Sequence, residues 1–172
     1  MKKNILAKTF DTVFAEKKEH SFKPEINILI FGLLICLVAW LTIENLNLFG
    51  HKSNSIFDVW TLSHIATGAV ISFFVIGFRK INVKNPIILV LLLSSCWEIV
   101  EHYLEIMGPE AVANWFAGEE SLMNRLVADQ LSLVVGFVII KARPKLFPLM
   151  LVISAGILIL HIILGDSMYF FN

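Results

Sequence analysis

The stretch that decides the fold is residues 87–107, which read IILVLLLSSCWEIVEHYLEIM. A helix needs about 17–25 mostly apolar residues to cross a bilayer, and this stretch has that length and character. It also carries Glu98, Glu101, His102 and Glu105, whose side chains are costly to place inside a membrane. The stretch therefore predicts a membrane-spanning helix that contributes to a polar site.

Four further apolar runs have similar lengths, at residues 26–43, 57–78, 121–140 and 146–164. Hydrophobic residues make up 57% of the 172 residues and charged residues only 16%, which is unlike the usage of soluble proteins. We therefore predict an all-α fold, a polytopic membrane helix bundle of about five transmembrane helices. Residues 25–172 would form this bundle as a single domain.

The basic residues predict the orientation of the bundle. With the N-terminus in the cytoplasm, 12 of the 14 Lys and Arg residues fall on the cytoplasmic side, which is the positive-inside pattern. Lys52 and Arg125 lie toward the far side, together with ten of the 14 acids and four of the five histidines. Five spans then place the C-terminus outside. We expect a multi-pass protein of the cytoplasmic (inner) membrane, and the short basic clusters give no reason to expect nucleic acid.

Residues 1–24 form a separate cytoplasmic segment. Leu6, Phe10, Val13 and Phe14 recur at helical spacing, which predicts an amphipathic helix on the membrane surface that ends at Pro24. A mobile basic tail is the alternative. The connections on the far side, residues 45–56 and 108–120, are longer than the cytoplasmic ones, and 112–116 could form a short interfacial helix.

The ionisable residues inside the runs lie at overlapping depths. Glu98, Glu101, His102 and Glu105 follow the spacing i, i+3, i+4, i+7 and so share one helical face. At a rise of about 1.5 Å per residue, His64 lies ~10 Å and Asp129 ~12 Å below the outer surface. We therefore predict one polar site in the outer half of the bilayer.

This site suggests a metal centre. Imidazole with carboxylate oxygens favours Zn, Mn or Fe over Ca, and the candidate ligands are His64, Glu98, Glu101, His102 and Asp129. One arginine cannot neutralise all these carboxylates. The alternative to a divalent metal is that some of the carboxylates hold protons.

Catalytic and binding roles can be assigned to the same region. Candidate catalytic groups for acid–base chemistry are Glu98, Glu101, His64 and Asp129. Candidate substrate-binding residues are Arg125, Asn124 and Trp97, with Arg125 contacting a phosphate. The alternative to a substrate-binding role for Arg125 is a structural ion pair with Asp129, four residues later on the same helix.

Other notable residues have structural interpretations. We expect four acids to be solvated on the outer face, and His161 to be either an interhelical hydrogen-bonding residue or a ligand. We expect three glycines to permit close helix approach and two cysteines to be small buried residues. The acids are Glu105, Glu110, Glu119 and Glu120; the glycines are Gly68, Gly136 and Gly156; the cysteines are Cys36 and Cys96.

The order of these residues resembles small uncharacterised bacterial integral-membrane families. The pattern is Ser63-His64-x-x-x-Gly68, then Trp97-Glu98-x-x-Glu101, then Asn124 and Asp129 before a further span. The general plan also resembles the VanZ-like group, and the likeness covers residues 58–136. It implies a bundle in the bacterial inner membrane with a His/Glu/Asp site, and it implies no particular reaction.

Three functions remain open. The first is a metal-assisted or acid–base enzyme acting on a lipid or lipid-linked headgroup. The second is a binding or transport module coupled to protons or cations. The third is a non-catalytic accessory or scaffold protein whose polar cluster holds the helices together. The expected partners are membrane lipids, and a homo-oligomer or a larger membrane complex is left open.

Overall fold

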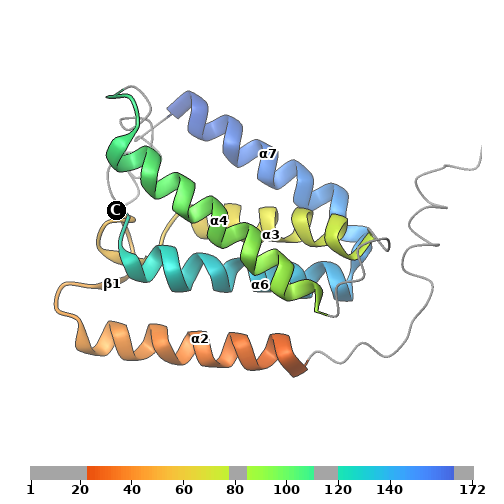
Figure 1. Cartoon of the computed structure of the whole chain (residues 1–172), viewed down its shortest axis with the longest axis horizontal. Helices are drawn as coiled ribbons and strands as arrows, with labels where there is room; N and C mark the ends of the chain where they lie inside the picture. Colours follow the sequence, from red (N-terminus) through yellow and green to blue (C-terminus); the bar gives the residue numbers. More distant parts are fainter. Residues whose placement is uncertain (1–22, 78–84, 111–119, 165–172) are drawn as a thin grey trace, which may run out of the picture.

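The fold comes from a computed structural model that describes residues 23–77, 85–110 and 120–164 (Figure 1). Its elements are α2 (Lys23–Thr42), β1 (Asn47–Phe49), β2 (Ser55–Phe57), α3 (Trp60–Gly77), α4 (Pro86–Met107), the π-helical turn η1 (Asn124–Ala128), α6 (Asp129–Ala142), the 3-10 turn η2 (Pro144–Leu146) and α7 (Phe147–Leu164). Each of the five predicted apolar runs therefore contains a helix, and the all-α bundle is confirmed.

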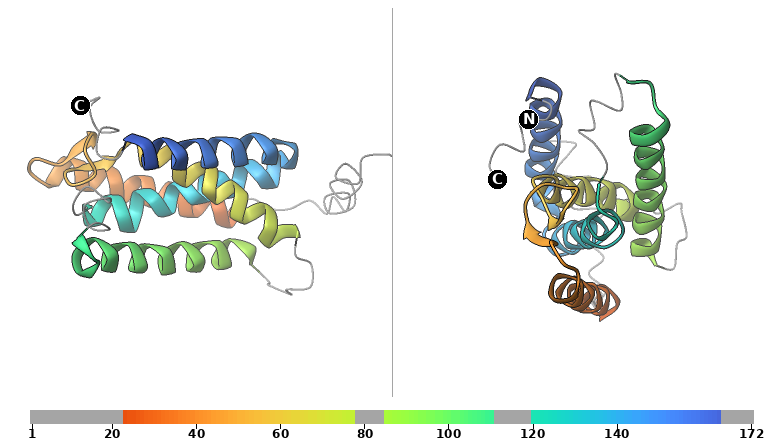
Figure 2. Two further views of the ribbon diagram at one scale, coloured as in Figure 1. Left: turned by 90° about the horizontal axis from the view of Figure 1, so that it is seen from above. Right: turned by 90° about the vertical axis from the view of Figure 1, so that its left-hand side faces the viewer.

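Four of the helices are long and apolar enough to cross a membrane: α2, α3, α4, and η2 with α7. They surround or flank α6, which follows η1 without interruption and carries more of the buried residues than any other described element. Viewed along the bundle, α3 and α6 lie in the middle and α2, α4 and α7 lie around them (Figure 2). The exposed faces of the outer helices are apolar, as contact with lipid requires.

The contact between α3 and α6 is the closest in the bundle. A Cβ atom on Gly68 would lie 2.6 Å from the backbone Cα of Leu133, and one on Gly136 would collide with the backbone of Ile65 and Ala69. Small residues allow this approach of two helix backbones. The predicted packing role of Gly68 and Gly136 is confirmed.

Two expectations about small residues are wrong. A Cβ on Gly156 would meet nothing within 4 Å, whereas Ser154, two residues earlier on α7, contacts Thr67 of α3. Cys96 is exposed, whereas Cys36 is buried as expected. Cys96 lies on the side of α4 that faces away from the bundle.

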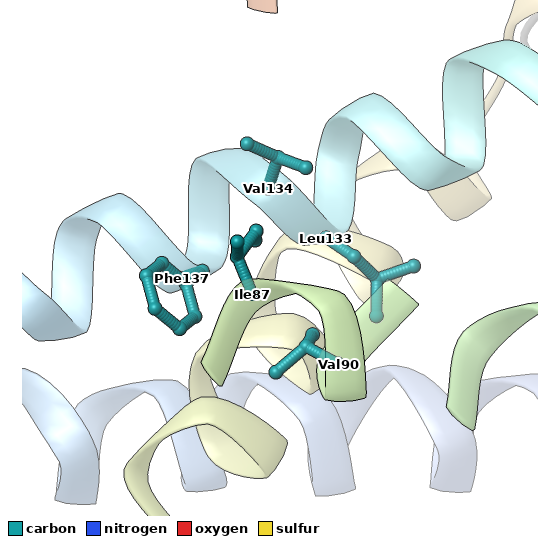
Figure 3. Close-up of a cluster of buried hydrophobic side chains, with 5 residues drawn as sticks. All are labelled: Ile87, Val90, Leu133, Val134 and Phe137. Atoms are coloured by element: carbon teal, nitrogen blue, oxygen red, sulfur yellow. The ribbon is translucent and has the colours of Figure 1, made fainter. Parts of the chain in front are cut away.

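One end of the bundle, called here the basic end, is packed with apolar side chains. Ile87 and Val90 of α4 meet Leu133, Val134 and Phe137 of α6, and all five are buried (Figure 3). At the same end, Nζ of Lys141 donates a hydrogen bond to Glu25 at 2.7 Å, which ties α6 to the start of α2.

The opposite end, called here the polar end, is built by the β1–β2 loop, the start of α3, the end of α4 and η1 (Figure 1). The two short strands were not predicted; they pair in parallel, with Asn47 opposite Ser55. Asn45 starts this loop with a φ of 63°, a conformation that asparagine tolerates better than most residues. Ile56 is fully buried, so the loop is part of the packed structure.

Some expectations lie outside the described residues. They are the amphipathic helix within residues 1–24, apart from its last two positions, and the interfacial helix at 112–116. The orientation of the bundle in the membrane stays a prediction from the positive-inside pattern, which places the polar end outside.

The α3–α6 contact leads to a first prediction. Gly136→Ala should lower the free energy of unfolding by about 1–3 kcal/mol or more, because overpacking a close contact forces the helices apart. Gly156→Ala is the matched control on α7, where the added methyl group meets open space, and it should leave stability unchanged or slightly raised. Thermal unfolding of both variants in detergent measures the effect. Equal melting temperatures for the two variants would contradict the packing role of Gly136.

Candidate functional site

Three ionisable side chains meet in the half of the bundle that lies next to the polar end. Ligand atoms of His64 on α3, Glu98 on α4 and Asp129 on α6 all lie within 4.8 Å of one another. Nε2 of His64 lies 3.5 Å from Oδ1 of Asp129, and Asp129 is fully buried. We call these three residues the His64 cluster.

The close helix contact explains why they meet. His64 lies one turn before Gly68 on α3, and Asp129 lies two turns before Gly136 on α6, so each residue shares a helix face with the glycine at the contact. Helix α4 packs against both α3 and α6 and brings Glu98 to the same level. The sequence predicted all three residues for one site, and the structure brings them together.

The charge of the His64 cluster is not balanced within the described residues. Both carboxylate oxygens of Glu98 are buried, and no donor in residues 23–77, 85–110 or 120–164 reaches them. The two carboxylate oxygens of Asp129 also have no such donor. Glu120 lies beside Asp129, and the two carboxyl groups can share a proton. A buried carboxylate without a partner is strongly unfavourable, so this cluster needs protons or a cation.

A second cluster of acids lies beside the first. Oxygens of Glu101, Glu105 and Glu120 also lie within 4.8 Å of one another. In this second cluster, two basic side chains offset the negative charge of the acids. Nζ of Lys52 is 2.6 Å from one oxygen of Glu105, and Arg125 contacts the other oxygen at 2.5 Å and Glu120 at 3.3 Å.

Two sequence-based expectations about these residues are wrong. Glu105 and Glu120 were expected in solvent, but their side chains are 0% and 5% exposed. They are buried because the polar end folds over them and supplies Lys52 and Arg125.

Arg125 also differs from the expected pairing with Asp129. It binds Glu105 and Glu120, and its Nη1 donates to the backbone carbonyl of Glu98 at 3.0 Å. Arg125 lies in the π-helical turn, in which the N–H of Asp129 bonds to the carbonyl of Asn124 five residues earlier. Such wide turns inside helices are frequent at functional sites.

Lys52 and Asp58 are site residues that the sequence reasoning missed. Asp58 caps α3, since its Oδ1 accepts from the N–H groups of Trp60 at 2.7 Å and Thr61 at 3.2 Å. Burial raises the pKa of Asp58, while these N–H groups and the side chain of Asn124 act in the opposite direction. The signal for Lys52 was available, because it is one of only two basic residues placed among the acids of the outer side.

The remaining predicted site residues are spread more widely. Asn124 is fully buried beside Asp58, Glu101 is half-buried, and Trp97 is 52% exposed on α4. His102 is exposed and belongs to neither acid cluster among the described residues. Although His102 follows Glu98 by one turn, it lies at the edge of the polar face and points away from the bundle.

A cavity of about 420 Å³ gives access to the His64 cluster. Residues of α3, α4 and α7 line it, including His64 and Glu98 themselves, with Lys52 and Glu120 at the polar end. His161, the single buried residue of α7, lies in its wall with its ring 4.3 Å from that of Trp60. Arg125 does not line this cavity, so Lys52 is the basic side chain that a bound molecule would meet.

Fold and site together define the class of protein: a helical bundle of membrane-spanning composition with a buried His–Glu–Asp cluster. The chain belongs to the family described as "Protein of unknown function (DUF2585)", whose model matches residues 30–169. No curated protein and no solved structure matches the chain. The expected membership of an uncharacterised family is confirmed, while a link to the VanZ-like group is not shown.

The second cluster leads to a prediction about pH. Burial, with the neighbouring Glu101 carboxylate, raises the pKa of Glu120 to about 7, although Arg125 and Asp129 act in the opposite direction. Between its ordinary pKa of 4.5 and about 7, the folded state keeps a proton that the unfolded state releases. The proton on Glu120 therefore contributes fully to the free energy of unfolding at low pH, and this contribution is lost as the pH rises toward 7.

In metal-free protein, Glu120→Gln should consequently gain stability relative to the wild type when the pH is raised from about 5 to about 8, by on the order of 1–3 kcal/mol. Thermal unfolding at a series of pH values measures this difference. Glu110→Gln, which changes an exposed acid, serves as the control and should show a constant offset. A constant offset for Glu120→Gln as well would contradict the raised pKa.

Proposed function

We propose that the chain binds a divalent transition metal through His64, Glu98 and Asp129 and uses it for metal-assisted acid–base chemistry in the membrane. The observation that carries the proposal is the pair of unpartnered oxygens on Glu98, buried beside Asp129 and His64 within the described residues. A bound cation would remove the cost of burying these carboxylates. We place the protein in the bacterial inner membrane, with the site in the outer half of the bilayer.

The ligand set suits such a metal. One imidazole and two carboxylates favour Zn, Mn or Fe, and metal sites with three protein ligands that keep an open position are typical of catalysis. The cavity reaches His64 and Glu98, so a bound molecule could approach the same atoms. When bound, a divalent metal polarises substrate oxygens and lowers the pKa of water.

Glu101 is the residue placed to transfer protons. It follows Glu98 by one turn on α4 and lines the cavity. General acid–base catalysis requires a proton-transferring group within reach of the bound substrate. The basic residues near it, Lys52 and Arg125, contact Glu105, which leaves Glu101 facing the cavity.

The packing of the basic end favours an enzyme over a transporter. Five buried apolar side chains of α4 and α6 pack together on the side of the site that faces that end (Figure 3). The residues that line the cavity extend no further in that direction than Ile71, Leu93 and Ser154. An ion bound at His64 would therefore have no polar route onward through the described residues, whereas a substrate could react and leave by the way it came.

The proposal is tested by the metal content of the purified protein. We expect about one transition-metal ion per chain by elemental mass spectrometry after purification without chelator. His64→Ala and the pair Glu98→Gln with Asp129→Asn should each lose most of it, since removing one ligand weakens such sites severely. Each variant must keep its helical circular dichroism for the result to count.

Matched controls distinguish the loss of a metal ligand from the loss of any ionisable side chain. His102→Ala removes an imidazole that is exposed on α4, and Glu110→Gln removes an exposed carboxylate; both should keep the metal. Loss of metal in His102→Ala would instead support the wider ligand set expected from the sequence. A metal-free wild type, even after incubation with Zn, Mn or Fe salts, would overturn the proposal and favour protonated carboxylates in a binding or scaffold role.

A further inference from the structure

The cavity changes character along its length. Its polar end carries Lys52, Glu101 and Glu120. Toward the middle of the bundle the wall is formed by Ile71, Leu93, Leu133 and Leu158, with a few hydroxyl groups. At about 1.5 Å per residue, Leu93 lies ~12 Å from Glu101 along α4, so one molecule could contact both parts.

The β1–β2 loop lies at the polar end of this cavity and contributes Lys52 to its wall. The carbonyl of Lys52 accepts a hydrogen bond from the N–H of Ser121 at 2.9 Å, and Oγ of Ser121 donates to the carbonyl of Ser55 at 3.0 Å. The side chain of Lys52 bridges the same loop to Glu105 near the end of α4. Lys52 is only 3% exposed, and the loop is joined to α4 and to the segment that leads into η1.

The side between α4 and α7 is different. Both helices pack on α3, one on each side of it, and they stand apart from each other when the bundle is seen along its axis (Figure 2). Trp97 and Leu93 of α4 and Leu158 of α7 line the cavity and are also about half exposed. In a membrane, a surface exposed at this depth faces lipid chains and not water.

From these observations we infer that the substrate is a membrane lipid that reaches the site laterally, between α4 and α7. Its headgroup would lie among Lys52, Glu101 and the His64 cluster, and its hydrocarbon chain would pass between Leu93 and Leu158. This inference rests on the proposed function for the reaction, while the binding of the lipid can be measured independently of it. Water-soluble molecules with the same headgroup should not be ligands, because they lack the hydrocarbon chain that the apolar part of the cavity would hold.

The test uses the full-length chain with its metal content measured. The protein is equilibrated with bilayers of dioleoyl phosphatidylglycerol, transferred to detergent and analysed by native mass spectrometry. We expect one retained lipid per chain in the wild type. Leu158→Trp should reduce this retention by about tenfold or more, which corresponds to at least ~1.4 kcal/mol, because the larger ring narrows the space between α4 and α7.

The matched control is Leu160→Trp, which makes the same change on α7 at an exposed residue that does not line the cavity. It should retain the lipid like the wild type. Leu93→Trp repeats the test from the opposite wall, should either α7 variant fail to fold. Metal content should stay unchanged in all three variants, so loss of lipid is distinguished from loss of the metal site.

Two displacement experiments test whether the retained ligand requires hydrocarbon chains. Dioctanoyl phosphatidylglycerol should displace the retained lipid, and glycerol 3-phosphate should not. Equal retention by the Leu158, Leu93 and Leu160 variants would overturn the lateral route, as would displacement by the soluble phosphate. A wild type that lacks metal but retains the lipid in this pattern would refute the proposed chemistry and leave the lipid site standing.

Discussion

The close contact of α3 with α6 is the constraint on which the site depends. Gly68 and Gly136 let the two backbones touch, and the same helix faces carry His64 and Asp129 to within 3.5 Å. A side chain larger than hydrogen at either glycine would widen the spacing and separate these two groups. Between membrane helices the hydrophobic effect provides little attraction, so close packing and polar contacts must hold them. Here the contact between α3 and α6 both packs the helices and brings His64 next to Asp129.

Burial of charge is the second constraint, and the two acid clusters meet it differently. Lys52 and Arg125 compensate Glu105 and Glu120 within the folded chain. That arrangement joins the loop, α4 and η1, so it also holds the polar end together. At the basic end, Glu25 pairs with Lys141 and joins α2 to α6, and a cluster of apolar side chains packs between α4 and α6. The two ends of the bundle thus differ in composition: apolar side chains pack at the basic end, and buried ionisable side chains gather at the polar end.

Much of this could be predicted from the sequence, because apolar length and helical spacing depend on local order. The five helices and the meeting of His64, Glu98 and Asp129 follow from span length and from depth along each helix. The predictions that were wrong concern residues whose surroundings depend on contacts between distant segments. Spacing alone placed His102 with Glu98, but the rotation of α4 against its neighbours turns that ring outward. The burial of Glu105 could not be foreseen, since it requires Lys52 from a loop 53 residues away.

The difference between the clusters determines which of them can receive a ligand. Around Glu105 the two cations come from the chain itself, and an added metal ion would have to compete with a lysine and an arginine already in place. Around Glu98 no described basic group reaches the carboxylate oxygens, and the cavity opens beside them. Acids of the same type on one helix, two turns apart, therefore have opposite roles. Glu105 is paired with basic side chains of the chain itself, whereas Glu98 has no such partner among the described residues and would be neutralised by the cation of the proposed site.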